Sequence, residues 1–126
     1  MEVDAGKRCV LIVDDEPLNR ELLRRVLGRD YLVEEAEDAC QALEHLERRN
    51  GDICLVLCDQ LMPGRSGTEL AAEARGRWPD VVFVLLTGFD DDPQVMAALH
   101  GGLVRQVVSK PWRAAALRAL IEQAIG

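Results

Sequence analysis

Apolar and polar positions along the chain follow two alternating patterns. Short, mainly apolar runs occupy residues 9–13, 31–36, 53–58, 81–86 and 103–108, and polar residues follow each of them. Such runs are typical of buried strands, whereas apolar residues recurring every three or four positions indicate a helix packed by one face. The segments after the five runs show the second pattern. The run at 31–36 is the most polar and is predicted to lie nearer an edge of a sheet.

The helix boundaries are marked by residues that cap or break helices. Pro17 suits the first turn of the first helix and Gly28 the position after its end. Asp38 with Gln41, and Ser66 with Glu69, have the spacing of capping boxes. The third helix is broken at 78–80, the fourth begins at 91–93 and ends at 101–102, and the fifth begins at about residue 112.

The periodicity also predicts which helical residues face inward. For the first helix these are Leu18, Leu22, Leu23, Val26 and Leu27; for the second, Ala39, Ala42, Leu43 and Leu46; for the third, Leu70, Ala71 and Ala74. The fourth helix carries Val95, Met96 and Leu99, and the fifth has an inner stripe of Leu117, Leu120, Ile121, Ala124 and Ile125.

Five strand–helix units in strict alternation predict an α/β fold, with a parallel sheet covered by helices on both faces. The 126 residues are enough for a single core, and no linker or low-complexity segment divides them. Residues 1–7 are expected to form a flexible tail and residues 8–126 the domain.

Composition narrows the class of protein. A net charge of −7 argues against direct binding to nucleic acid, which depends on neutralising phosphates. No apolar run approaches the ~20 residues needed to span a membrane, and the polar N-terminus has no signal-peptide pattern. The four cysteines lack a Cys-x-x-Cys spacing, so we interpret them as reduced, mostly buried thiols of a cytoplasmic protein.

Polar residues with chemical potential follow four of the predicted strands. Asp14 and Asp15 follow the first strand, Asp59 the third, Thr87 the fourth and Lys110 the fifth. Each alone is an ordinary turn or loop residue. Because parallel strands end at one edge of a sheet, the five are expected to converge on one crevice. Asp59 could then be a metal ligand, a nucleophile or a turn-former.

The charges in such a crevice indicate a cation. Two carboxylates about 4 Å apart repel each other by roughly 4 kcal/mol at an effective dielectric near 20. Lys110 compensates one of three carboxylates, and a hard divalent ion with oxygen ligands, Mg²⁺, is the candidate for the rest. Carboxylates, Mg²⁺, an ammonium and a hydroxyl are the groups needed to stabilise a transferring phosphoryl group, with Asp59 as the nucleophile.

The chain resembles the receiver domains of two-component response regulators from about residue 8 to 125. The resemblance rests on the acidic pair at 14–15, the stretch from Asp59 through Met62-Pro63 to Gly67, Thr87-Gly88, and Lys110-Pro111. It implies a flavodoxin-like, doubly wound (βα)₅ three-layer sandwich with strand order 2-1-3-4-5. It also implies a signalling domain without turnover of an external substrate.

The roles that the resemblance implies are specific. Asp59 would accept a phosphoryl group from a sensor histidine kinase or a phosphotransfer protein. Asp15, Asp59 and the backbone carbonyl of Leu61 would bind Mg²⁺ directly, with Asp14 acting largely through water. Thr87 and Lys110 would contact phosphoryl oxygens. The face formed by the fourth helix, fifth strand and fifth helix would then change and control a partner or a C-terminal output domain. A homodimer is left open.

Two positions, Val107 and Trp112, depart from the commoner family pattern, and two others, Leu61 and Phe89, are ones that tune the lifetime of the phosphorylated state in this family. Val107 stands where the family usually has an aromatic residue, so a relay by aromatic rotation is unavailable. Trp112 replaces the commoner Phe and suggests a Lys-Pro-Trp subgroup; its role is either packing at a helix start or contact with a partner. Leu61 and Phe89 cannot orient a hydrolytic water by hydrogen bonding, which predicts self-dephosphorylation over hours rather than seconds.

Three other functions compete with this interpretation. An FMN carrier is disfavoured because the acidic residues at 14–16 would repel a phosphate after the first strand. A hydrolase of external phosphate esters is disfavoured because the chain is too short for a cap domain. A phosphorylation-independent interaction module on the receiver scaffold remains the main alternative.

Overall fold

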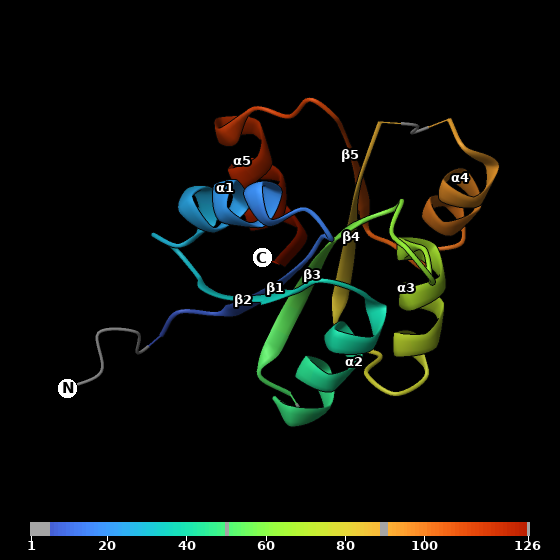
Figure 1. Ribbon diagram of the computed structural model, residues 1–126, viewed down its shortest axis with the longest axis horizontal. Coiled ribbons are helices and arrows are strands. Elements are labelled where there is room, and N and C mark those ends of the chain that lie inside the picture. The colour runs from blue at the N-terminus through green and yellow to red at the C-terminus, as the bar shows by residue number, and fades with distance from the viewer. Residues whose placement is uncertain (1–5, 50, 89–90, 126) are drawn as a thin grey trace.

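The computed structural model describes residues 6–49, 51–88 and 91–125, and within them five strands alternate with five helices (Figure 1). The elements are β1 (Cys9–Val13), α1 (Pro17–Leu27), β2 (Leu32–Ala36), α2 (Ala39–Arg48), β3 (Ile53–Asp59), α3 (Gly67–Arg75), β4 (Val82–Thr87), α4 (Pro93–His100), β5 (Gln106–Ser109) and α5 (Ala114–Ile125). Among the described helices none has the length and apolar character required to cross a membrane.

The strands form one parallel sheet in the order β2-β1-β3-β4-β5. Helices α1 and α5 cover one face of this sheet, and α2, α3 and α4 cover the other (Figure 1). The predicted three-layer α/β architecture and the strand order are therefore confirmed. The order places β3, which ends in Asp59, at the centre of the sheet.

Alternate residues of the central strands supply two separate cores. Successive side chains of a strand point to opposite faces, so β1 gives Leu11 to the core under α2–α4 and Val10 and Ile12 to the core under α1 and α5. The strand that was predicted to be covered on both faces, β4, buries Phe83 and Leu85 on one side and Val84 and Leu86 on the other. The continuous apolar runs follow from this double coverage.

Strand β2 lies at the edge of the sheet, as its more polar sequence predicts. Its two glutamates point to opposite faces. Glu35 pairs with Arg24 of α1 (Nε to Oε2, 2.8 Å) and more loosely with Arg20. These ion pairs tie the edge strand to the helix that precedes it and place charge where another strand would otherwise pair.

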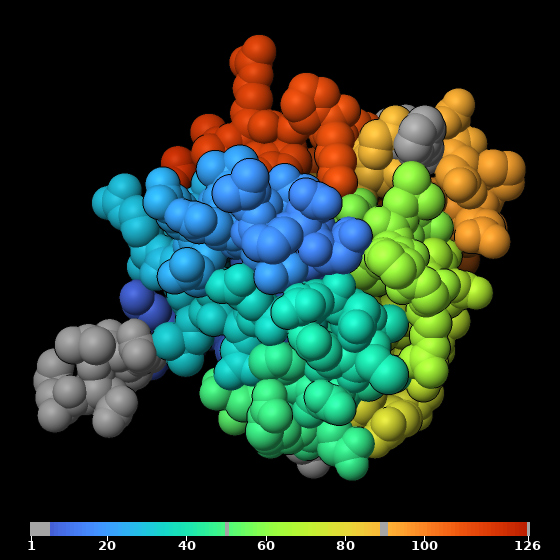
Figure 2. All heavy atoms as spheres, viewed as in Figure 1, coloured from blue at the N-terminus to red at the C-terminus, as the bar shows by residue number. Residues whose placement is uncertain are grey.

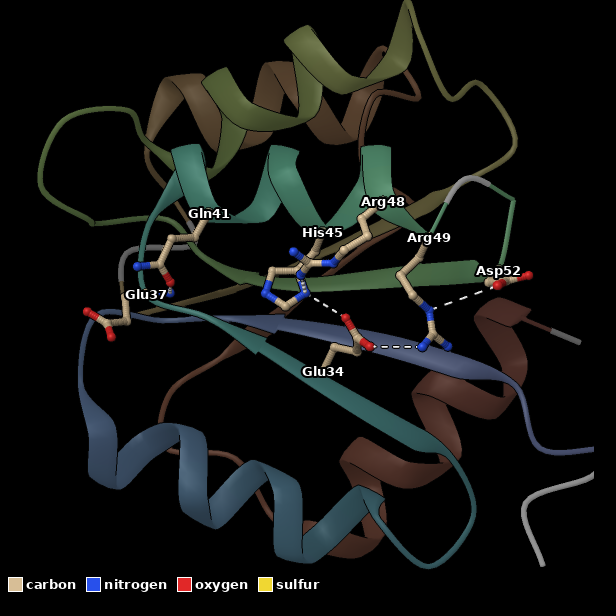
Figure 3. A network of polar contacts seen from close by, with 7 residues as sticks. All are labelled: Glu34, Glu37, Gln41, His45, Arg48, Arg49 and Asp52. Atoms are coloured by element: carbon tan, nitrogen blue, oxygen red, sulfur yellow. Dashed lines mark hydrogen bonds and ion pairs between the residues drawn. The ribbon is translucent and has the colours of Figure 1, made fainter. Parts of the chain in front are cut away.

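On the opposite face, Glu34 is the centre of a polar network with α2 (Figure 3). The Nδ1 atom of His45 contacts Oε1 of Glu34, and an Arg49 terminal nitrogen lies 3.1 Å from Oε2. Arg49 also approaches Asp52, at 3.9 Å. The network joins β2, α2 and the turn before β3, so the edge strand is held by charged contacts as well as by packing.

The caps predicted for α2, α3 and α4 are present. Asp38 accepts a hydrogen bond from the Gln41 backbone N–H, and Ser66 and Glu69 form a complete reciprocal capping box. Asp92 caps α4 and is followed by Pro93 in the first turn. For α2 the reciprocal bond differs, because the Gln41 side chain accepts from Glu37 rather than from the N-cap residue.

The predicted inner face of α1 is partly wrong. Leu23 and Leu27 are buried, but Leu18 is 77% exposed and Leu22 is 51% exposed. The four leucines form two stripes that are offset by one residue, hence by about 100° around the helix. A helix on a sheet can turn only one such stripe inward. On α4, Val95 and Ala98 are buried, while Met96 is 42% exposed and Leu99 is 37% exposed, so the predicted inner face of this helix is also partly wrong.

Some boundaries and assignments differ from the predictions. β5 begins at Gln106 because the N–H groups of Leu103 and Val104 are bonded to the Ala98 carbonyl at the end of α4. α5 begins at Ala114, after a cis Lys110–Pro111 peptide bond. All four cysteines are free thiols, and Cys40 is exposed. The predicted tail at 1–7 lies largely outside the described residues, so the domain bounds stay a prediction.

The corrected face of α1 can be tested by two alanine substitutions. Leu23→Ala should lower the free energy of unfolding by about 2–5 kcal/mol, because it removes a fully buried side chain. Leu18→Ala should change it by no more than about 0.5 kcal/mol, because that side chain is in solvent. Urea unfolding of the two variants checks this, and equal losses would contradict the assigned face.

Candidate functional site

The predicted site residues converge at the carboxyl edge of the sheet. Asp14 follows β1, Asp59 ends β3, Thr87 ends β4 and Lys110 follows β5. In Figure 2 the blue segment after β1, the green segment after β3 and the orange-red segment near residue 110 approach one another at the surface. The sheet thus brings together residues that are far apart in the sequence.

Three carboxylates form the acidic part of the site. Asp14, Asp15 and Asp59 each offer an oxygen, and these oxygens all lie within 4.8 Å of one another. Asp14 and Asp59 are buried, whereas Asp15 is exposed. Ionised carboxylates at such distances repel one another.

Lys110 supplies the positive charge that was predicted at this edge. Its Nζ lies 3.0 Å from Oδ1 of Asp59, across the crevice between β3 and the end of β5. One ammonium faces three carboxylates, which leaves an excess of negative charge when all are ionised. The Lys110 backbone N–H donates to the Thr87 carbonyl over 2.9 Å, so the ends of β4 and β5 are joined as well.

The environment of Asp14 shows how costly this arrangement is. Desolvation raises the pKa of its carboxyl group above the ordinary value, and the charge of Asp59 raises it further. A hydrogen bond of 2.9 Å from the Glu16 backbone N–H acts in the opposite direction. Arg20 does not neutralise the carboxylate, because its guanidinium donates to the Asp14 backbone carbonyl instead.

The donor set fits a hard divalent cation. All three side chains offer carboxylate oxygens, the preferred ligands of Mg²⁺, and their spacing allows them to share one ion. A bound cation would offset the repulsion between the carboxylate charges, which burial of Asp14 and Asp59 strengthens. The predicted Mg²⁺ site is thus compatible with the residues present.

Thr87 and Leu61 lie beside the acidic group in different surroundings. Thr87 is buried at the end of β4, where it pairs in register with Ser109 of β5. Leu61 is 59% exposed at the start of the loop between β3 and α3. The predicted roles of the Thr87 hydroxyl and the Leu61 carbonyl remain predictions. Phe89, the second residue expected to slow hydrolysis, lies outside the described residues.

A cavity of about 420 Å³ adjoins the acidic group and was not anticipated from the sequence. Asp14 and Lys110 line its polar side, and Leu22, Leu86 and Trp112 line its apolar side. The Trp112 ring is partly buried against the core under α1 and α5, so it packs at the same time as it borders the cavity. The sequence signal that could have indicated this cavity is the stripe of Leu18 and Leu22 on α1. The periodicity had assigned both residues to the buried face of the helix.

Val107 occupies the position where an aromatic residue was expected. It pairs in register with Leu85 of β4 and is partly buried against the core under α2–α4. The smaller side chain therefore contributes to the packing of this core.

Comparison with known proteins identifies the family. The family model described as the response regulator receiver domain matches residues 10–122. Among curated relatives, the hydrogenase transcriptional regulatory protein HoxA of Cupriavidus necator is 34% identical over 116 residues, which is 92% of this chain and 24% of the relative. The chain thus spans about a quarter of the length of this relative.

Solved structures agree with the family model. The response regulator protein TrrA of Thermotoga maritima, in complex with Mg(2+)-BeF, has a TM-score of 0.78 at 30% identity and covers 93% of this chain and 98% of its own. A response regulator receiver domain protein of Clostridium thermocellum has a TM-score of 0.87 at 26% identity, with 94% of each chain covered.

The family match covers most of the chain, and the residues that carry it gather at one edge of the sheet. The strand order and the three layers are those expected of the family. This chain belongs to the receiver domains of two-component response regulators.

Proposed function

We propose that this receiver domain accepts a phosphoryl group on Asp59 from the phosphohistidine of a sensor histidine kinase or a phosphotransfer protein. The observation that carries the proposal is the surroundings of Asp59. It ends the central strand, its Oδ1 lies 3.0 Å from the Lys110 ammonium, and two further carboxylates lie beside it. The Mg(2+)-BeF complex of the relative TrrA supports a metal-dependent site of this kind.

The proposed transfer is an in-line displacement at phosphorus. A carboxylate oxygen of Asp59 attacks the phosphorus atom, an O–P bond forms and the P–N bond breaks. The bonding electron pair returns to the imidazole, and Asp59 becomes an aspartyl phosphate. Lys110 offsets negative charge on the phosphoryl oxygens from the side on which it already contacts Asp59.

Asp14, Asp15 and Asp59, with the Leu61 carbonyl, are the residues that would hold Mg²⁺. When bound, the ion supplies positive charge to the equatorial phosphoryl oxygens and relieves the repulsion among the carboxylates. The domain acts as a signalling module without turnover of an external substrate. The exposed thiol of Cys40 suits a reducing compartment, and we propose the cytoplasm.

Phosphorylation adds about −1.5 to −2 charge at Asp59 and thereby changes the contacts of Lys110 and Thr87. We propose that these two residues turn toward the phosphoryl group, with Thr87 bonding one of its oxygens. Their backbones are already joined by the bond from Lys110 N–H to the Thr87 carbonyl. The ends of β4 and β5 therefore move together, which provides a relay that needs no aromatic residue at Val107.

The face formed by α4, β5 and α5 is the proposed output surface. Met96 and Leu99 of α4 are partly exposed to solvent, and helices of this kind can bury such residues against a partner or an output domain. The length of HoxA beyond the matched segment leaves ample chain for an output domain in that relative.

The donor must reach Asp59 from outside, and the surface beside it is apolar. Leu18 and Leu22 of α1 and Leu61 after β3 are all more than half exposed. Leu22 also borders the cavity that Trp112 and Lys110 line. We propose that the kinase or phosphotransfer protein packs an apolar helix face against this surface.

Asp59→Asn should abolish phosphoryl uptake, because the amide is not a competent nucleophile. The purified domain would be incubated with acetyl phosphate and Mg²⁺, and the mass gain of one phosphoryl group measured. Asp52→Asn, an exposed aspartate in the turn before β3, is the matched control and should behave like the wild type. Uptake by Asp59→Asn equal to that of the wild type would refute the acceptor. Uptake by neither protein would favour a phosphorylation-independent module.

Self-dephosphorylation of the wild type should take hours, because the Leu61 side chain cannot orient a water. Leu61→Asn places an amide at the same position and should shorten the half-life several-fold. Decay of the phosphorylated mass after removal of acetyl phosphate measures both rates, with Leu99→Asn as a control on a distant exposed leucine. A wild-type half-life under a minute would contradict the proposal.

Truncation of the apolar surface should slow phosphoryl transfer from a histidine kinase but not from acetyl phosphate. Leu18→Ala with Leu22→Ala should slow transfer from a histidine kinase about tenfold, a loss typical of one interface contact worth roughly 1.4 kcal/mol. Uptake from acetyl phosphate should not change. The kinase would be the one that phosphorylates the wild type fastest among those of the source organism.

Met96→Ala with Leu99→Ala, on α4, is the matched control for this surface and should leave both donors unaffected. Equal slowing of both donors by the α1 pair would show that those leucines act on the site and not on docking.

A further inference from the structure

Gln60, the residue directly after Asp59, carries a buried side chain that the proposed chemistry does not use. It is only 2% exposed. Its backbone N–H donates to the Leu86 carbonyl of β4 over 3.1 Å, and its own carbonyl accepts from Gly67 N–H over 3.0 Å. Gln60 therefore lies between the end of the sheet and the first residue of α3.

The carboxamide of Gln60 bonds the same turn of α3 twice. Its Oε1 accepts from the Thr68 backbone N–H at 2.9 Å, and its Nε2 lies 3.2 Å from the Thr68 hydroxyl oxygen. That hydroxyl is 3.1 Å from Oγ of Ser66, the N-cap of α3. Together with the backbone bond to Gly67, these contacts join the two ends of the loop at 61–66.

Gly67 shows how closely the start of α3 approaches the end of β3. A Cβ atom at this position would lie 2.8 Å from the Asp59 carbonyl oxygen and 2.7 Å from a methyl group of Leu85. It would also lie 3.1 Å from Oε1 of Gln60. The start of α3 therefore presses against the backbone of the proposed phosphoacceptor itself, and no side chain fits between them.

We propose that Gln60 is a positioning residue of the phosphoacceptor site. Its carboxamide holds the first turn of α3 against the end of β3 and so fixes the backbone of Asp59 and Leu61, which flank it. This inference rests on the proposed function, because Leu61 matters through its carbonyl as a metal ligand. Gln60 itself is buried away from solvent and belongs neither to the carboxylates nor to the cation of the site.

The chemistry of the contact explains why this position requires an amide. The Thr68 N–H needs an acceptor, and the amide nitrogen gives the Thr68 hydroxyl a donor at the same time. Methionine has similar length but would leave the N–H without a partner. Glutamate would keep the acceptor but place a buried charge next to Asp59.

Gln60→Met is the variant that tests the inference, since every charged group of the site is unchanged. Mg²⁺ alone would be titrated against the folded protein, with the change in tryptophan fluorescence as the signal, since Trp112 lies near Asp14 and Lys110. We expect the dissociation constant for Mg²⁺ to rise about fivefold or more. The initial rate of uptake from acetyl phosphate should fall at low Mg²⁺ and recover largely at saturating Mg²⁺.

Leu46→Ala is the control for a general loss of stability, because Leu46 is a buried residue of α2, which does not contribute to the site. Urea unfolding of both variants gives the stability each has lost. The inference predicts that Leu46→Ala keeps wild-type Mg²⁺ affinity. It is overturned if Gln60→Met binds Mg²⁺ as the wild type does, or if Leu46→Ala weakens binding equally.

The experiments distinguish an error in the proposed function from an error in the role proposed for Gln60. A wild-type protein that takes up no phosphoryl group refutes phosphorylation at Asp59, whatever Gln60→Met does to the Mg²⁺ titration. A wild-type protein that is phosphorylated, with a Gln60→Met variant identical to it in Mg²⁺ affinity and rate, refutes the positioning role alone.

Discussion

Repulsion among three carboxylates at the end of a buried sheet is the constraint on which the site depends. Asp14, Asp15 and Asp59 bring their oxygens within 4.8 Å of one another, and two of the three are buried. Lys110 offsets part of the repulsion between such close carboxylates. The packing of the two cores on either side of the sheet opposes the rest, because the central strands are apolar on both faces. The acidic group is therefore a locally unfavourable feature at the edge of a well-packed sheet.

That constraint also explains why the surroundings of the site are so firmly held. Lys110 contacts Asp59 and is bonded through its backbone to Thr87. Gln60 ties the loop after Asp59 to α3, and Glu16 N–H bonds the Asp14 carboxylate. Each contact fixes one strand end against its neighbours, so a change of charge at Asp59 acts on elements that cannot adjust independently. A receiver domain needs this coupling if a local modification is to alter a distant face.

Much of the site could be predicted from the sequence because its residues follow strands directly. The ends of parallel strands share one edge, so Asp14, Asp59, Thr87 and Lys110 could be placed together from the sequence alone. The cavity beside them could not be predicted, since it depends on which stripe of α1 turns inward. Leu18 and Leu22 have the same periodicity as Leu23 and Leu27, and hydrophobicity alone does not choose between them. The contact between Gln60 and Thr68 could not be predicted either, because a single glutamine after a strand belongs to no distinctive sequence pattern.

The local sequence was enough to predict the alternation of five strands and five helices, the burial of the sheet on both faces and the gathering of charged residues at one edge. These depend on local periodicity and on chain direction, which neighbouring residues encode. Three features became apparent only in the folded chain: the rotation of α1, the late start of β5 at Gln106 and the bonds from Gln60 to Thr68. These depend on competition between segments for the same partners, as when the Ala98 carbonyl takes the N–H groups of Leu103 and Val104. Such competition is resolved by packing in three dimensions and leaves no periodic trace along the chain.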